Sequence, residues 1–338
     1  MIGRRVFCAL ALVATATLSA GCSKGPAPPK RVAMVAGTLG FGDRSYNDAA
    51  RAGLAACTQQ TGTQTDAVVA RSADYGRALT LLATENYDAV IALGFAMAPD
   101  VAKAARRFEN THFALIDAVV DLPNVSSFTF DEAQGSFLAG AAAALVSKTR
   151  VVAFLAGSPS PLLERYEAGF TAGARTIDPR IVARVAYAGS FDDVAAGRRV
   201  AASLIARGAD IVYAVAGRSG LGAIAAVKAQ PGAYVIGVDS DQDALAPGKV
   251  LTSVVKRVDL AALRVCREAN AQKPVSGHIV LGVADGGIGL TGFAYTRGVI
   301  GGAGLARLDR IRRALAAGTI EPPRSRAELR TFRVVAVP

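Results

Sequence analysis

The sequence of 338 residues contains no tryptophan and only two histidines, and the common catalytic signatures are missing from it. His112 and His278 lie far apart and lack the spacing of metal ligands, which argues against a zinc site. No G-x-S-x-G elbow, Walker motif or G-x-G-x-x-G turn joins a strand to a helix, and no histidine or cysteine is placed as a base or nucleophile. These absences predict a binding protein without a metal or other cofactor, not an enzyme.

Long apolar runs are missing after the N-terminal segment, so we expect no later part of the chain to span a membrane. The first residues, "MIGRRVFCALALVATATLSAGC", combine two arginines, a short apolar stretch and small residues before Cys22. This layout is typical of a secretory signal, and a cysteine at its end is typical of a bacterial lipoprotein. We therefore expect a signal peptide over 1–21, lipidation of Cys22 and a lipid-anchored, extracytoplasmic place in the cell envelope.

The lipoprotein signal departs from the usual pattern at one position. Leu18 lies four residues before Cys22, and Ser19 takes the place three residues before it, where leucine is usual. A secreted protein without a lipid is therefore the alternative. The proline-rich stretch over 22–30 is expected to be a tether, because it has no side chains that could form a core.

Acidic residues are few relative to basic ones, with 27 Asp and Glu against 38 Lys and Arg, a net charge of +11. A basic excess can indicate a nucleic acid, an anionic lipid surface or an acidic ligand. Here the basic residues are scattered or lie in helical stretches such as "LDRIRRALAAG", with no aromatic residues between them. We interpret them as a solvated surface and expect no nucleic-acid partner.

Cysteines are also few. Of the four in the sequence, Cys57 and Cys266 are the two that remain once the signal is removed and Cys22 carries lipid. They could form a disulfide in an oxidising compartment. Both stand in alanine-rich helical patterns, where a buried free thiol is the more common outcome, so we expect two buried thiols.

Short runs rich in Val, Ile and Ala recur along the chain with helical patterns between them, among them "RVAMVAG", "YDAVIALG", "RVVAFLAG" and "DIVYAVAG". Continuous apolar strands that alternate with helices predict parallel sheets covered on both faces, an α/β architecture. A polar break at 128–135 separates two such series, which predicts two Rossmann-like lobes joined by several crossovers. We expect the first lobe over 31–130, completed by about 251–290, the second over 131–250, and a C-terminal segment over 291–338.

The loops that follow the expected strands are the candidate ligand-binding segments, because ligands of open α/β sheets bind at the carboxyl ends of the strands. These loops hold mostly glycine, small polar, acidic and aromatic residues, as in "GFAMA", "GSFDD", "GRSG" and "DSDQD". They contribute Phe95, Gly217 and Arg218 as candidates for the walls of a cleft between the lobes.

The stretch "GFGDRSYND" at 40–48 lies between an expected strand and helix. Ser45 can cap the helix, with Asp48 completing a weak capping box. Neither role needs Asp43, Tyr46 and Asn47 together, because a carboxylate, a ring and an amide at a helix N-terminus also suit a small polar ligand with a flat face. A plain turn and a ligand loop both remain open on this stretch alone.

Several stretches in the same order resemble the basic membrane protein family, the bacterial lipoproteins that act as purine-nucleoside receptors for ABC importers. "GDRSYND" resembles the family's D-K-S-F-N signature, and the likeness continues through "SFLAGAAAALVSKT", "RYEAGFTAGA", "YAGSFDD", "VIGVDSDQ" and "VLTSVVKRVD". The resemblance covers about residues 31–290. It implies a type I periplasmic-binding-protein fold that closes on its ligand by hinge motion and acts with an ABC transporter permease.

Specific roles follow from the same resemblance. It gives Asp43 and Asn47 a base- or ribose-binding role and places Tyr46 where the family's first-lobe phenylalanine stacks on the purine. Phe191 is the candidate ring from the opposite lobe. Asp239 and Lys256 are the residues expected to hold the ribose hydroxyls. We expect the protein to be a monomer.

Two positions depart from the family's pattern. Gly37 stands where members commonly carry an acid at the end of the first strand, and the family's "GGTG" turn is "GRSG" here, which introduces Arg218. Losing an acid and gaining a guanidinium should shift the preferred ligand toward a more anionic or differently substituted one. A receptor or sensor for a sugar, autoinducer or amino acid on the same fold is the alternative.

Overall fold

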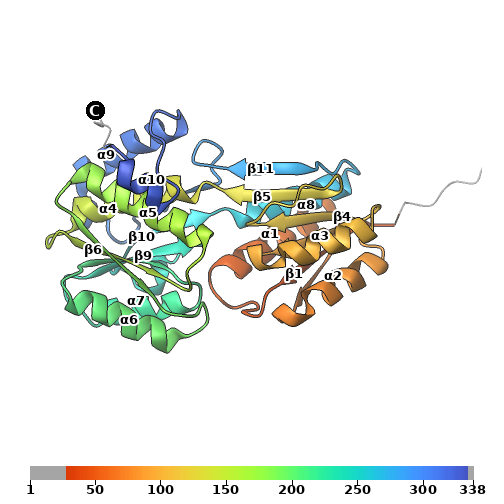
Figure 1. The fold of residues 1–338 in the computed structure, drawn as a ribbon, viewed down its shortest axis with the longest axis horizontal. Coiled ribbons are helices and arrows are strands. Elements are labelled where there is room, and N and C mark those ends of the chain that lie inside the picture. The colour runs from red at the N-terminus through yellow and green to blue at the C-terminus, as the bar shows by residue number, and fades with distance from the viewer. Residues whose placement is uncertain (1–27, 334–338) are drawn as a thin grey trace, which may run out of the picture.

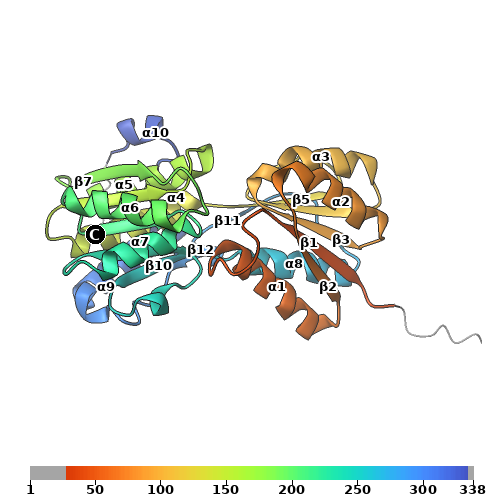
Figure 2. The same ribbon diagram turned by 90° about the horizontal axis from the view of Figure 1, so that it is seen from below.

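The computed structural model describes residues 28–333, which form two lobes side by side along the long axis of the molecule (Figure 1). The expected signal peptide, Cys22 and most of the expected tether lie outside the described residues. Strand β1 (Arg31–Ala36) begins at the outer end of the first lobe, away from the second lobe (Figure 2). Within 28–333, no helix has the length and apolar character needed to cross a membrane.

The first lobe is built on a parallel sheet whose strand order is β11-β5-β4-β3-β1-β2. Helices α1 and α8 cover one face of this sheet, and α2 and α3 cover the other. The remaining bounds of this lobe are α1 (Tyr46–Thr61), β2 (Gln64–Val69), η1 (Ser72–Asp74), α2 (Tyr75–Thr84), β3 (Ala89–Leu93), η2 (Phe95–Met97), α3 (Ala98–Arg107), β4 (His112–Ile116), β5 (Val125–Phe130), α8 (Val258–Asn270) and β11 (Gly277–Leu281).

The second lobe has a sheet with the order β12-β10-β9-β8-β6-β7, parallel except for the pairing of β12 with β10. Helices α4 and α5 cover one face, and α6 and α7 cover the other. The elements are α4 (Glu132–Val146), β6 (Val151–Ala156), α5 (Pro161–Ile177), β7 (Val182–Tyr187), α6 (Val194–Ala206), β8 (Ile211–Val215), α7 (Ser219–Lys228), β9 (Tyr234–Asp239), η3 (Asp243–Leu245), β10 (Val250–Lys256) and β12 (Ile288–Leu290).

The C-terminal segment packs on the second lobe. Helix α9 (Arg297–Ala316) lies against α4, and the short α10 (Arg326–Thr331) lies against α5. Leu308, Ile311 and Leu315 of α9 are buried in the same cluster as α4 and α5. The segment therefore extends the core of this lobe, because its apolar side chains complete one face of it.

The expected polar break at 128–135 is wrong, because residues up to Phe130 belong to the buried strand β5 and α4 begins at Glu132. The serines of β5 are buried with hydrogen-bond partners: the Ser126 hydroxyl donates to the carbonyl of Val275, and the Ser127 hydroxyl accepts the backbone amide of Val120. Satisfied hydroxyls remove the cost of burying polar groups, so the polar sequence does not prevent a strand.

The expected completion of the first lobe by 251–290 also differs from the structure. Strand β10 pairs in parallel with β9 and so belongs to the second sheet, and the chain crosses to the first lobe only at α8. It remains there through β11 and returns at β12, which pairs with β10. The composition of β10 fits either sheet, and its pairing with β9 determines the lobe to which it belongs.

The expectation of two free thiols is wrong, because Cys57 of α1 and Cys266 of α8 form a disulfide. The two helices pack against each other over the first sheet through small side chains, including Ala50, Ala261 and Ala262. This close packing leaves the Cα atoms of the two cysteines 6.2 Å apart, a separation typical of disulfides.

Candidate functional site

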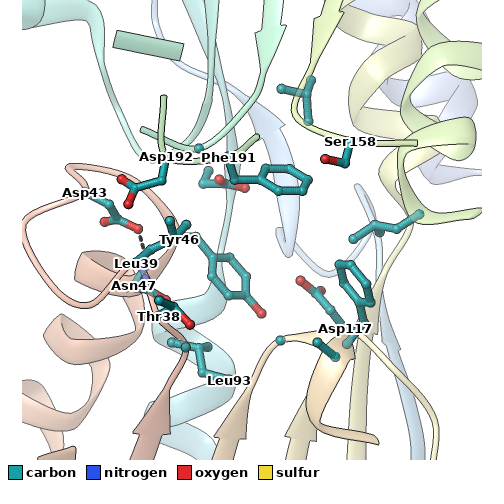
Figure 3. Close-up of a pocket in the computed structure, with 18 of the residues that line it drawn as sticks. Thr38, Leu39, Asp43, Tyr46, Asn47, Leu93, Asp117, Ser158, Phe191 and Asp192 are labelled. Carbon is teal, nitrogen blue, oxygen red and sulfur yellow. Dashed lines mark hydrogen bonds between the residues drawn. The ribbon is translucent and has the colours of Figure 1, made fainter. Parts of the chain in front are cut away.

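A cavity of about 530 Å³ lies between the lobes at the carboxyl ends of strands from both sheets. Both lobes contribute to its wall, with Thr38, Tyr46 and Asp117 from the first and Ser158, Phe191 and Asp192 from the second (Figure 3). Eight of the nine residues predicted to bind ligand line this cavity: Asp43, Tyr46, Asn47, Phe95, Phe191, Gly217, Asp239 and Lys256. The position at strand ends agrees with the general rule for open α/β sheets.

The loop between β1 and α1 is held in shape by Asp43, not by Ser45. The Asp43 carboxylate accepts the backbone amides of Ser45 at 3.0 Å, Asn47 at 2.8 Å and Asp48 at 3.1 Å. Ser45 occupies the N-cap position as expected, but its side chain makes no capping bond and its hydroxyl donates instead to Asp239 in the other lobe, at 2.9 Å. Asp43 is thus engaged in building the turn.

The remaining polar side chains of this loop are also engaged within it. Asn47 donates its side-chain amide to the carbonyl of Gly40 at 2.7 Å. The Asp48 carboxylate accepts the backbone amides of Gly42 and Arg44 instead of forming the expected capping box. The effect is a rigid loop that presents the Tyr46 ring at the start of α1.

Two aromatic rings from opposite lobes face the cavity. Tyr46 points from the N-terminus of α1 toward the middle of the cavity, and Phe191, from the loop after β7, lies on the other side of it (Figure 3). Phe191 packs over Gly157 at the end of β6, where an added Cβ would lie 2.3 Å from the ring. A glycine at this position is what allows the ring to occupy its place.

Beyond the rings lies a buried ionic cluster centred on Lys256, whose side chain is 2% exposed. Its ammonium lies 2.5 Å from Oδ1 of Asp117 and 3.2 Å from Oε1 of Glu132, and Arg165 binds the other oxygen of Glu132 at 2.9 Å. Burial alone would lower the pKa of Lys256, but the carboxylates of Asp117, Glu132 and Asp239 outweigh it and raise the pKa. Lys256 therefore stays positively charged, with the three carboxylates around it.

Asp239 and Asp117 occupy matching places in the two lobes, each at or just after the end of a strand. Both have left-handed backbone conformations, with φ of 66° for Asp239 and 78° for Asp117. Non-glycine residues rarely adopt such angles outside sites where the surroundings enforce them. Burial raises the pKa of Asp239 to about 6, although Lys256 and the Ser45 hydroxyl oppose the shift.

The Tyr46 hydroxyl is directed toward Asp117 (Figure 3). It is buried, and within residues 28–333 it has no hydrogen-bond partner. Burial, together with the negative charge of Asp117, raises the pKa of Tyr46 well above its ordinary value. The ring therefore stays neutral at any physiological pH and can offer a flat, uncharged face.

Arg218 is the predicted site residue that the structure places outside the cavity wall. Its guanidinium forms an ion pair with Asp192 at 2.9 Å and donates to the carbonyl of Leu39, across the cleft, at 2.8 Å. Because both contacts use its charge and its donors, the expected preference for a more anionic ligand is not supported by its position.

The other departure is Gly37, and a side chain from a neighbouring element fills the space beside it. An added Cβ at Gly37 would lie 2.9 Å from the hydroxyl of Tyr75, which lines the cavity from the start of α2. A phenol therefore stands beside the strand end where the family commonly has an acid. Nothing in the local sequence around Tyr75 could have indicated this, because it depends on how α2 packs on the sheet.

Other residues of the site were missed for similar reasons. Asp117 and Asp192 stand in the strand-end loops "DAVVD" and "GSFDD", so their position in the sequence could have identified them. Glu132 and Tyr166 lie within helical patterns and carry no such signal. Among residues 28–333, no group of three or more His, Cys, Asp or Glu side chains is arranged to hold a metal ion.

Two α/β lobes that enclose a cleft at their strand ends define the type I periplasmic-binding-protein fold. The solved structure of an ABC transporter system solute-binding protein from Aeropyrum pernix K1 matches this chain with a TM-score of 0.80, covering 90% of this chain and 96% of that one. The two sequences are 23% identical, so this likeness concerns the fold alone. The predicted fold class is confirmed.

Sequence comparison identifies the family within that class. The family model Bmp, described as ABC transporter substrate-binding protein PnrA-like, matches residues 30–297. The chain is 31% identical over 313 residues to "ABC transporter nucleoside-binding protein BmpA" of Lactococcus lactis subsp. cremoris, covering 83% of this chain and 89% of that one. It is 33% identical over 285 residues to "Basic membrane protein A" of Borreliella burgdorferi, covering 82% and 80% of the two chains. The chain belongs to the Bmp family, as the sequence resemblance predicted.

The protein is therefore the substrate-binding component of an ABC transporter. It is extracytoplasmic, binds a small molecule, acts with a permease and is not an enzyme.

Proposed function

We propose that the small molecule is a purine nucleoside, held between Tyr46 and Phe191. The observation that carries this proposal is the pair of aromatic rings from opposite lobes in one cavity (Figure 3). Flat heterocycles stack on such rings, with a gain of about 1–3 kcal/mol for each base stacked on an aromatic side chain. The name of the relative BmpA from Lactococcus lactis, a nucleoside-binding protein, supports the same class of ligand.

The charged wall suits the ribose part of such a ligand. Asp239 and Lys256 supply an acceptor and a donor to the same cavity wall, which is the combination that vicinal hydroxyls pair with. Three carboxylates, from Asp117, Glu132 and Asp239, surround this one lysine. A ligand that is neutral and rich in hydroxyls fits this balance better than one that carries a phosphate.

Ligand binding then closes the cleft. Tyr46 and Phe191 belong to different lobes, so a ring stacked on both contacts the closed form more extensively than the open form. The three connections between the lobes, after β5, after β10 and between β11 and β12, are short segments that can serve as the hinge. The protein performs this cycle as a monomer.

A thermal-shift screen tests the ligand class. Purine nucleosides, free bases, sugars and amino acids are added in turn to the purified protein, and the midpoint of unfolding is recorded. A selective ligand should raise the midpoint, because it binds only the folded state. We expect adenosine, guanosine or inosine to give the largest shift. A shift with a sugar or an amino acid and none with a nucleoside would overturn the assignment.

We also propose that Cys22, which lies outside the described residues, carries the lipid that anchors the protein. Replacing this residue by serine should move the protein from detergent-extracted membranes to the soluble extracytoplasmic fraction. Membrane association that is unchanged in the Cys22→Ser variant would contradict the anchor.

A further inference from the structure

Arg218 makes the contact from which we draw a further inference. Its guanidinium donates through Nη2 to the carbonyl oxygen of Leu39, at 2.8 Å, and pairs through Nη1 with Asp192, at 2.9 Å. Arg218 and Asp192 belong to the second lobe, whereas Leu39 belongs to the loop after β1 in the first lobe. The contact therefore joins the two lobes across the cleft through residues of the protein alone.

The Leu39 contact lies at the edge of the cavity. Leu39, Asp192 and Gly217 all line it, while Arg218 itself is not part of its wall. The Leu39 side chain also approaches the second lobe, because a Cβ added at Gly217 would lie 3.7 Å from its Cδ1. Arg218 thus holds Leu39, a residue of the cavity wall, without lining the cavity itself.

Separate contacts hold the other end of the same loop. The Ser45 hydroxyl donates to Asp239 at 2.9 Å, Ser240 donates to the carbonyl of Ser45 at 2.8 Å, and Gln242 donates to the carbonyl of Arg44 at 3.3 Å. Within residues 28–333, Arg218 supplies the one side-chain hydrogen bond from the second lobe to the part of the loop over 37–41. Loss of Arg218 should therefore release this part and leave the end near Ser45 attached.

We propose that Arg218 is a positioning residue that latches the closed form and slows the release of ligand. One planar guanidinium binds two acceptors at once through different nitrogens, and the ion pair with Asp192 aims it at Leu39. A lysine has a single nitrogen and cannot keep both contacts in this geometry. A contact that forms only when the lobes are together stabilises the closed form, whatever ligand is inside it.

The latch is reversible because it is partly solvated. The side chain of Arg218 is 33% exposed and that of Asp192 is 44% exposed. Partly exposed ion pairs contribute modestly and are weakened by salt, whereas a hydrogen bond from a charged donor adds more. We therefore expect a change of about 3–10-fold in the dissociation rate, not a complete loss of binding.

Stopped-flow displacement tests this inference, with adenosine, guanosine and inosine as probes; this readout rests on the proposed function. In the Arg218→Ala variant, the dissociation rate should rise about 3–10-fold while the association rate changes less than about twofold. The Arg218→Lys variant should resemble Arg218→Ala. The matched control is Arg199→Ala, which removes an exposed arginine of α6 in the same lobe and should leave both rates unchanged. Rising salt should speed dissociation from the parent more than from Arg218→Ala.

A second measurement needs no ligand. Small-angle X-ray scattering of unliganded Arg218→Ala should give a larger radius of gyration than the unliganded parent and Arg199→Ala, because the open form becomes more populated. If no nucleoside binds the parent, the proposed function fails, and the scattering comparison alone decides on the latch. Equal dissociation rates in parent and Arg218→Ala, or equal radii of gyration where no probe binds, would overturn the inference.

Discussion

At the scale of single residues, Tyr46 has a ring that can stack on a ligand and a hydroxyl that can form hydrogen bonds, and the two roles can be tested separately. Its ring faces the cavity, while its hydroxyl is buried beside Asp117 without a hydrogen-bond partner in the described part of the chain (Figure 3). The hydroxyl can therefore be removed by a phenylalanine that keeps the ring in place, whereas an alanine also removes the contact of the ring with Lys256.

Replacing Tyr46 by phenylalanine should leave nucleoside affinity nearly unchanged, because the flat face is kept. Replacing it by alanine should weaken binding by about 1–3 kcal/mol, the scale of base stacking on an aromatic residue. Isothermal titration with a purine nucleoside measures both changes, and thermal unfolding of each variant provides the control for stability. Equal losses in the two variants would show that the hydroxyl, not the face, binds the ligand.

Asp239 should make binding depend on pH in a range where carboxylates usually do not. Its pKa is raised to about 6, so it gains its negative charge only as the pH rises through about 6. Ribose hydroxyls donate to the charged carboxylate, and affinity should therefore increase as the pH rises from about 5 to 7. Titrations across this range should show the increase in the parent and a flat, weaker profile in Asp239→Asn. An affinity of the parent that falls as the pH rises would contradict this role.

The sequence indicated most of the wall of the cavity, because strand-end loops can be found from apolar strands and the glycines after them. The sequence indicated much less about which polar atoms remain available to bind a ligand. Asp43 is an example: a carboxylate near a helix N-terminus can bind either a ligand or the backbone, and only the structure places three amides on it. Arg218 is another, since a residue 179 positions from Leu39 in the sequence cannot be paired with it without the fold.

At the scale of elements, strands and helices followed from apolar runs and helical periodicity, whereas their partners did not. Strand β5 was missed because its serines made the segment look too polar for a buried strand. In the structure, the hydroxyls of Ser126 and Ser127 form hydrogen bonds with neighbouring segments. Strand β10 was placed in the wrong lobe because its composition suits either sheet. Pairing is a property of the folded chain, and local pattern carries no information about it.

The disulfide between α1 and α8 makes a prediction at this scale. It closes a loop of 209 residues between Cys57 and Cys266, and removing such a cross-link increases the freedom of the unfolded chain. A variant with both cysteines replaced by alanine should lose about 2–5 kcal/mol in its free energy of unfolding, measured by denaturant titration. Reductant should destabilise the parent and have no effect on the variant. Equal stability of parent and variant would show that the disulfide does not contribute.

At the scale of the whole molecule, two lobes, several crossovers and a cleft at the strand ends follow from the alternation of strands and helices. The residues at which the chain crosses between the lobes cannot be predicted from this alternation. The packing of α9 and α10 on the second lobe cannot be predicted from it either (Figure 1). The family model ends at residue 297, so resemblance also gave no information on these last helices.

A crystal structure of the protein with a bound purine nucleoside tests the central claim most directly. We expect the purine to lie between the rings of Tyr46 and Phe191, with the ribose hydroxyls at Asp239 and Lys256. Arg218 should still donate to the carbonyl of Leu39 in that closed form. A nucleoside bound away from these two rings, or a cleft that stays empty at saturating nucleoside, would contradict the account.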